Sequence, residues 1–97
     1  MRMIFTYGNA DIYPYKGGWT EIIAPTTRLC IDIFRAYHPD RTPGILNCAD
    51  YYSFSDFRDT EMYRDGNFGK RRHEKITVMR MRTYPERDER RKGAGEE

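Results

Sequence analysis

The sequence predicts a single small α+β domain. Ninety-seven residues suit one hydrophobic core, because single domains commonly hold about 100–150 residues. Short runs rich in β-branched and aromatic residues indicate strands, and one amphipathic run indicates a helix. The predicted order is β-β-α-β-α-β, which we interpret as a mostly antiparallel sheet of about four strands, with one firm and one short helix on one face.

The first two strands are predicted at residues 2–7 and 19–23. The first ends at a Gly-Asn turn signal, and its alternation places Phe5 and Tyr7 on the same face. Between the strands, Pro14 removes a backbone donor, so the segment around it is expected at a sheet edge or in a loop.

The firm helix is predicted over residues 26–37. Pro25 and two threonines form a start signal, and Pro39 ends the helix because it pushes His38 out of the helical region. The apolar residues fall on one side of a helical wheel and the charged residues fall opposite, as in a helix packed on a sheet. The apolar set is Leu29, Cys30, Ile33, Phe34 and Tyr37.

The second half of the domain is predicted as strand, short helix, turn and strand. Residues 45–49 read as a short strand, and Ser53 begins a capping-box pattern for a helix over 54–64. Glycines at 65–69 indicate a tight turn. Residues 73–81 alternate as a last strand.

The C-terminal residues differ in composition from the rest of the chain. Residues 83–97 contain one aromatic residue and no aliphatic residue larger than Ala, so they cannot bury enough surface to offset the entropy of ordering. We therefore predict a single α+β domain at residues 1–82, followed by a charged, flexible tail at 83–97.

The net charge of +2 hides an uneven distribution. Residues 40–69 carry three basic and six acidic residues, whereas residues 70–82 carry six basic residues and one acidic residue. Such a strip is typical of a solvated strand edge, but it also attracts nucleic acid or an acidic protein face. Its basic members are Lys70, Arg71, Arg72, Lys75, Arg80 and Arg82.

Two cysteines allow a catalytic alternative. Cys48 with His73, oriented by Asp50 or Glu74, has the residue types of a nucleophilic triad, which would make the chain a small Cys-dependent hydrolase. No recognised local signature surrounds Cys48, and we favour a core cysteine in a short strand over a catalytic one. We therefore predict a protein that is not an enzyme.

Metal, cofactor and membrane sites are not expected. The cysteines and histidines are Cys30, His38, Cys48 and His73, and they lack the closely spaced pair that structural zinc sites use. No run of about 18 apolar residues predicts a membrane helix. Because the N-terminus lacks the long apolar region of a signal peptide and there are only two thiols, we expect a cytoplasmic protein.

The aromatic residues favour a binding surface. Eight Tyr and one Trp exceed what a core of this size can hold, and exposed Tyr beside Arg is typical of protein interfaces. The group Tyr13, Tyr15 and Trp19 is the most conspicuous. With Lys70, Arg71 and Arg72, it forms the predicted partner-binding set.

Several short strings of the sequence have a distinctive composition. They are Tyr7-Gly8-Asn9 with Ile12-Tyr13-Pro14, residues 18–22, Asn47-Cys48 with Tyr51-Tyr52-Ser53, and residues 66–69 with His73-Glu74. These strings resemble a family of small, uncharacterised proteins from phages and mobile elements of Gram-positive bacteria. Such short accessory proteins often inhibit host defence, and anti-CRISPR proteins are among them, so the resemblance implies a viral inhibitor without naming its chemistry.

The leading hypothesis is a non-enzymatic binding protein that occludes a functional surface of a host defence nucleoprotein complex. The first alternative is a nucleic-acid-binding accessory protein that uses the strip at residues 70–82. The second alternative is the Cys-dependent hydrolase. A homodimer through an exposed strand edge is compatible with each of them.

Overall fold

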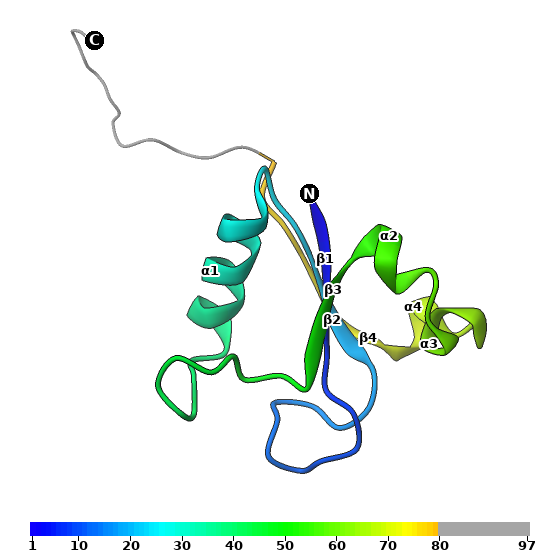
Figure 1. Cartoon of the computed structure of the whole chain (residues 1–97), viewed down its shortest axis with the longest axis horizontal. Coiled ribbons are helices and arrows are strands. Elements are labelled where there is room, and N and C mark those ends of the chain that lie inside the picture. The colour runs from blue at the N-terminus through cyan, green and yellow to red at the C-terminus, as the bar shows by residue number, and fades with distance from the viewer. Residues whose placement is uncertain (80–97) are drawn as a thin grey trace, which may run out of the picture.

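The computed structural model describes residues 1–79, and the predicted tail, Arg80 and Arg82 lie outside this range. The described residues form one four-stranded sheet in the order β3-β1-β2-β4, which Figure 1 shows nearly edge-on. One 11-residue helix and three single-turn helices accompany it, which confirms the predicted α+β class. The elements are β1 (Arg2–Thr6), β2 (Trp19–Ile23), α1 (Thr27–Tyr37), β3 (Asp50–Ser53), α2 (Phe54–Phe57), α3 (Glu61–Arg64), α4 (Phe68–Arg71) and β4 (Arg72–Thr77).

The sheet is mixed. β1 pairs antiparallel with both β2 and β3, as expected for a mostly antiparallel sheet. β4 instead runs parallel to β2. Parallel neighbours need a long crossover connection, and here α1, β3 and the three short helices supply it.

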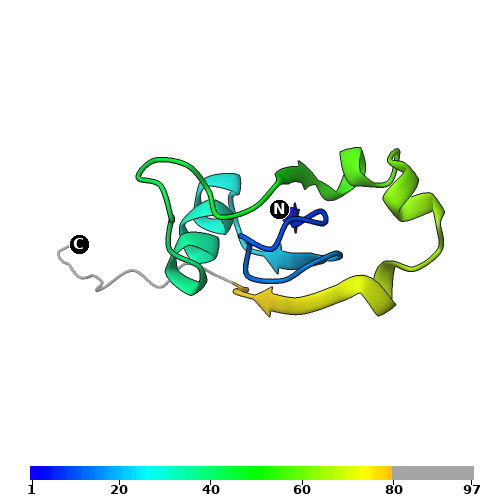
Figure 2. The same cartoon turned by 90° about the horizontal axis from the view of Figure 1, so that it is seen from below.

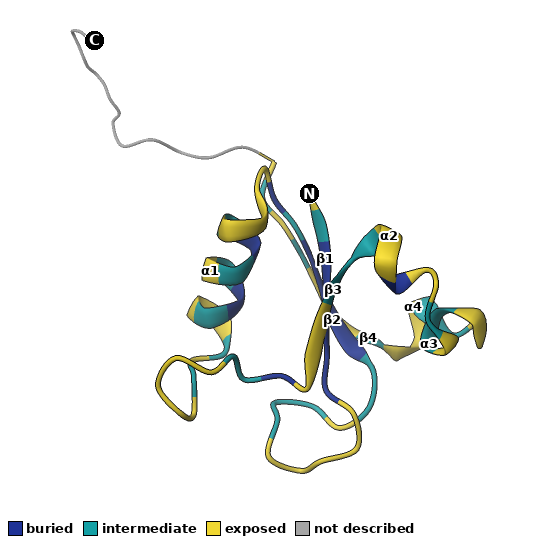
Figure 3. Cartoon of the chain, in the orientation of Figure 1, coloured by how far each residue is buried: buried dark blue, intermediate teal, exposed yellow. Residues whose placement is uncertain are grey.

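Helices cover both faces of the sheet, so the prediction that they share one face was wrong. Figures 1 and 2 show α1 on one side and α2–α4 on the other. Phe5 and Tyr7 share the α1 side with Phe34, as their alternation predicts, whereas Ile4 meets Phe57 on the opposite side. The physical reason lies in β2, whose first four residues are all buried and therefore need cover on both faces (Figure 3).

The firm helix agrees with its prediction. Thr26 caps α1 by accepting the N–H of Leu29 at 3.0 Å, and the helix ends at His38, one residue before Pro39. Cys30 and Phe34 are its fully buried residues. The Phe34 ring stacks on Phe5 with 4.4 Å between ring centroids, which fixes α1 against β1.

The third strand lies later than predicted. Residues 45–49 form a loop, and β3 begins at Asp50. Tyr51 stacks on Phe5 of β1 with ring centroids 6.0 Å apart, so the two tyrosines that follow the predicted strand make the cross-strand contacts. The apolar residues Ile45 and Leu46 stand next to each other and do not alternate, and they turn towards solvent and α1 instead.

The predicted helix over residues 54–64 is two separate turns. Ser53 caps α2 through the N–H of Asp56, as its capping-box pattern predicts. Thr60 then interrupts the helix, because its hydroxyl donates to the Phe57 carbonyl at 2.7 Å and also accepts the N–H of Tyr63. Sequence reasoning did not anticipate α4, which occupies the last part of the predicted turn at residues 65–69 and continues to Arg71.

The pairing of β4 with β2 contains one extra residue. Trp19 lies opposite Arg72 and the next residue, Thr20, lies opposite Glu74, so His73 is left between the two pairs. In a regular strand Arg72 and Glu74 would point to the same face. The extra residue turns them to opposite faces of the sheet.

Gly18 provides the space for this irregularity. Its φ is +74°, and a Cβ there would clash with the Arg71 carbonyl oxygen and lie 2.8 Å from His73 Nε2. Gly17 has the same φ of +74°, but nothing lies within 4 Å of the corresponding position. Substituting each glycine by alanine therefore separates two contributions to the loss of stability. Both variants have the strain of positive φ, and only the Gly18 variant also has the clash with β4 and the residue before it.

We expect Gly18→Ala to lower the free energy of unfolding by about 3 kcal/mol or more, because positive φ and a backbone clash act together. Gly17→Ala, the matched control, should cost about 1 kcal/mol from positive φ alone. Urea denaturation followed by circular dichroism measures both. Equal losses in the two variants would contradict the close approach of Gly18 to β4.

Candidate protein-binding site

A fully buried carboxylate joins the first and last strands on the face covered by α2–α4. Glu21 is 0% exposed and forms ion pairs with Arg2 and with Arg72, the latter at 2.9 Å. The Arg2 guanidinium also lies 3.6 Å from the centre of the Phe54 ring. Arg72, a predicted partner contact, is thus engaged inside the fold. Removing it would leave the buried Glu21 carboxylate with Arg2 as its only cationic partner among the described residues.

A second polar cluster lies on the α1 face around Glu74. Its carboxylate accepts from Thr20 at 2.8 Å, from His38 Nε2 at 2.8 Å and from the Tyr15 hydroxyl at 3.1 Å. Since the Thr20 proton goes to Glu74, the buried Tyr7 hydroxyl donates to Thr20. Burial alone would raise the pKa of Glu74, but the hydrogen bonds from His38 and Thr20 lower it below the ordinary value.

Tyr15 and His73 attach the loop at residues 8–18 to β4. Their rings stack with centroids 4.6 Å apart, and His73 Nε2 lies 2.7 Å from the carbonyl oxygen of Gly17. Tyr15, predicted as a contact residue, is therefore half-buried against the core. Its contacts with the strip are therefore internal ones, because its ring stacks on His73 and its hydroxyl donates to Glu74.

Trp19, a predicted partner contact, lies in the core of the domain. It is 1% exposed and packs edge-on against Phe57 with ring centroids 5.0 Å apart. Its position at the start of β2, beneath Phe57 of α2 and Phe68 of α4, explains the burial. Within residues 1–79 its indole N–H has no hydrogen-bond acceptor.

Of the predicted basic strip, Lys70, Arg71 and Lys75 have exposed side chains. Arg72 serves Glu21, as described above, and Glu74 faces the α1 cluster. Because one cation and one carboxylate both turn inward, Lys70, Arg71 and Lys75 are the charges that the strip exposes within residues 70–79.

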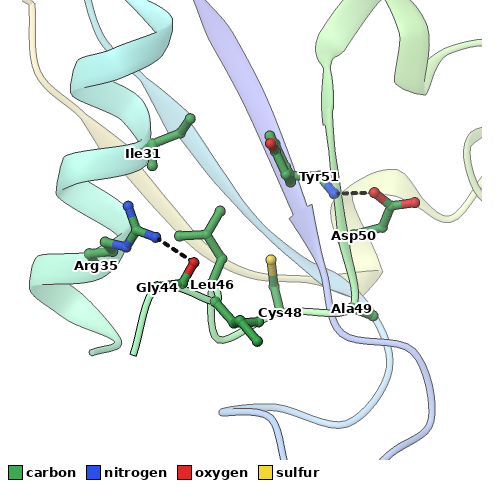
Figure 4. Close-up of a pocket in the computed structure, with 9 residues that line it drawn as sticks. Ile31, Arg35, Gly44, Leu46, Cys48, Ala49, Asp50 and Tyr51 are labelled. Atoms are coloured by element: carbon green, nitrogen blue, oxygen red, sulfur yellow. Dashed lines mark hydrogen bonds between the residues drawn. The ribbon is translucent and has the colours of Figure 1, made fainter. Parts of the chain in front are cut away.

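A cavity of about 410 Å³ lies between α1 and β3. Figure 4 shows Ile31 and Arg35 of α1 on one side, Asp50 and Tyr51 of β3 on the other, and the loop at residues 44–49 along the wall. The Cys48 thiol and Leu46 project between them. Its size falls in the range of about 300–1,000 Å³ that is typical of ligand pockets.

A second cavity of about 230 Å³ adjoins the first, because Ile45 and Leu46 line both. Tyr13, a predicted contact residue, lies in its wall beside Arg41 and Asn47. The Asn47 side-chain oxygen is buried without a hydrogen-bond partner among the described residues. The structure thus separates Tyr13, which faces this cavity, from Tyr15, which faces β4.

Exposed apolar side chains surround the two cavities. Ile12 is 54% exposed, Ile45 62% and Tyr51 45%. We call Ile12, Tyr13, Ile45, Leu46 and Tyr51 the loop face. Sequence reasoning missed four of these five residues, and the adjacent apolar pair Ile45-Leu46 directly after a Pro-Gly turn is the signal that could have indicated a loop with an apolar exposed side.

The chemistry of Cys48 is that of a buried thiol. Burial, with a smaller contribution from the nearby Asp50 charge, raises the pKa of Cys48 to about 12. His73, its predicted partner, bonds Gly17 instead. Within residues 1–79 no group of three or more His, Cys, Asp or Glu side chains has an arrangement that could hold a metal ion.

No family model matches the chain, and neither the curated proteins nor the solved structures contain a match. The resemblance to phage and mobile-element proteins therefore stays a prediction. None of the helices described in residues 1–79 has the length and apolar character needed to cross a membrane.

The Glu74 cluster predicts an acid-dependent loss of stability. Because the folded-state pKa is lowered, ionised Glu74 stabilises the fold above the ordinary Glu pKa of about 4.3, and this contribution disappears as the pH falls through the lower folded-state value. We expect Glu74→Gln to be destabilised at neutral pH and to approach the wild type in acid. Urea denaturation across this pH range measures the convergence. A constant difference, or the same convergence in the exposed control Glu61→Gln, would contradict the cluster.

Cys48 should react slowly with iodoacetamide in the folded protein. Its raised pKa leaves little thiolate near pH 8, so we expect labelling at least about tenfold slower than in the chain unfolded by urea. Mass spectrometry of the Cys48 peptide measures the rate, and the buried Cys30 provides an internal comparison. Labelling of Cys48 faster than in the unfolded chain would revive the hydrolase alternative.

Proposed function

We propose that this protein is a non-enzymatic protein-binding domain and that the loop face is its contact surface. The observation that carries the proposal is the pair of adjoining cavities that share Ile45 and Leu46 and are rimmed by exposed apolar residues. Exposure of such an apolar patch to water is unfavourable, and patches of this kind commonly mark binding sites. A partner that covers Ile45 and fills the cavities would bury them.

The residues around the larger cavity support binding over catalysis. Among residues 1–79 no histidine lines it, the Cys48 thiol has a raised pKa, and the Asp50 carboxylate accepts the N–H of Tyr51. A nucleophile needs a lowered pKa or an adjacent base. Apolar walls with a few polar groups instead favour the anchoring of a partner side chain.

We propose a host defence complex as the partner, on the basis of the resemblance to phage and mobile-element proteins. An inhibitor of a host defence complex acts by covering a functional surface, which a small domain with one apolar face can do without chemistry of its own. The nucleic-acid alternative keeps one supporting observation, the exposure of Lys70, Arg71 and Lys75. We place it second because the two cavities contain none of these three residues.

Ile45→Asp should abolish partner capture. A carboxylate at this position places a charge between the two cavities, and we expect recovery of the partner from a Gram-positive bacterial lysate to fall at least about tenfold. Met79→Asp is the matched control, because it adds the same charge at an 81% exposed residue outside the cavities. Quantitative mass spectrometry of the captured proteins measures both.

The same capture separates the alternatives. If Met79→Asp loses the partner as strongly as Ile45→Asp, the loop face is not the contact surface. If nuclease treatment removes the partner and Lys70→Glu with Arg71→Glu abolishes capture, the nucleic-acid function replaces the proposed one. Arg72 is left unchanged in that variant because it neutralises buried Glu21.

A further inference from the structure

The open edge of β3 indicates what kind of partner the larger cavity takes. In the sheet order β3-β1-β2-β4, β3 is a terminal strand, so its outer edge is paired with no strand of the described residues. It is four residues long and lies directly beside the cavity, to which Asp50 and Tyr51 contribute. An open strand edge offers backbone donors and acceptors in the spacing that another extended chain can bind.

One backbone group on β3 is satisfied in a way that a partner can replace. The N–H of Tyr51 donates to the side chain of the preceding residue, Asp50, at 2.8 Å in an exposed position (Figure 4). Because water competes for both groups there, this contact contributes little to stability. A backbone carbonyl of an added strand can take the N–H of Tyr51 and release the Asp50 carboxylate to solvent.

The cavity then fixes one side chain of the added strand. Tyr51 points to the α1 side of the sheet, where its ring stacks on Phe5. Side chains of an added strand alternate between the two faces, so every second one would enter the space between Tyr51 and Ile31 of α1. The walls formed by Ile31, Leu46 and Cys48 suit an apolar side chain.

Arg35 favours a negative charge on the residue of the added strand that lies next to the apolar one on the same face. Its Nε is held by Asp40 at 3.0 and 3.1 Å, and its Nη2 makes only a long contact of 3.5 Å with the Gly44 carbonyl. Among the described residues Nη1 has no hydrogen-bond partner, and Figure 4 shows the guanidinium group beside the cavity. Arg41 lines the second cavity, and its Nη1 donates to the Ile12 carbonyl at 2.8 Å. The donors that Arg35 leaves free therefore complement an acidic partner side chain on the α1 side of the cavity, whereas the Asp50 carboxylate lies on the opposite, β3 side.

We propose that the loop face binds an extended segment of another protein by strand addition to β3. The segment places an apolar side chain in the cavity of about 410 Å³ and an acidic side chain two residues away, on the same face, next to Arg35. This inference rests on the proposed binding function and specifies its partner as an extended acidic-apolar peptide.

The test uses fluorescein-labelled heptapeptides and the full 97-residue chain. Each peptide has a central Leu or Phe, Glu at the positions two residues to either side, and Thr elsewhere. Each of these peptides has two modified versions. In the first, Lys replaces both Glu residues, and in the second, the backbone amides of the central residue and its neighbours carry N-methyl groups. Fluorescence anisotropy measures binding.

We expect the Glu peptides to bind and the Lys peptides to bind at least about tenfold more weakly, because the cations at the site attract only the former. N-methylation should abolish binding, because it removes the donors and blocks pairing with β3 while keeping every side chain. Arg35→Gln should reduce the preference for Glu over Lys, whereas Lys75→Gln, on the other edge strand, should not. The peptide modifications leave the protein unchanged, so they test the inference even if Arg35→Gln fails to fold.

Three results would overturn the inference. These are no binding of any peptide, equal binding of the N-methylated peptide, and equal binding of the Lys peptides. Concentration-dependent dimers of the wild type in sedimentation experiments, dissociated by Ile45→Asp, would assign the edge to a second copy instead. Because partner capture tests the loop face separately, loss of capture in Ile45→Asp with no peptide binding would reject strand addition and leave the proposed function standing.

Discussion

The pairing of β4 with β2 is the constraint on which most of the polar structure depends. One extra residue at His73 turns Arg72 towards Glu21 on one face and Glu74 towards Thr20 on the other. Both carboxylates are thereby compensated, and burying them uncompensated would cost several kcal/mol. The same irregularity sends His73 to the Gly17 carbonyl, which holds the loop at residues 8–18 against the last strand.

Cover on both faces explains where the binding surface lies. α1 protects one side of the sheet and three single-turn helices protect the other, so the central strands have no exposed face left for recognition. Three exposed apolar residues, Ile12, Ile45 and Tyr51, instead gather where the loops at residues 8–18 and 38–49 meet the edge strand β3. A rigid sheet that presents its contacts on loops is a common way to combine a small core with a binding site.

The sequence predicted elements well where a local signal agreed with packing. Thr26 and Pro39 mark the two ends of α1. The alternation of side chains along β1 placed Phe5 and Ile4 on opposite faces of the sheet. It failed where long-range contacts decided the outcome. The strand expected at residues 45–49 became a loop because stacking of Tyr51 on Phe5 sets the register of β3 with β1. Of the predicted contact residues, Tyr13 lines a cavity, whereas Trp19 lies in the core.

By itself, the sequence determined the α+β class, the bounds of the long helix, the caps at Thr26 and Ser53 and the excess of aromatic residues. These depend on residues close together in the chain, for which periodicity and capping chemistry suffice. Only the tertiary structure decided that both faces of the sheet are covered, that Arg72 is an internal partner of Glu21, and that Ile12, Ile45 and Tyr51 share one surface. These last facts join residues from separate loops and strands, and no local pattern encodes which distant segments pack together.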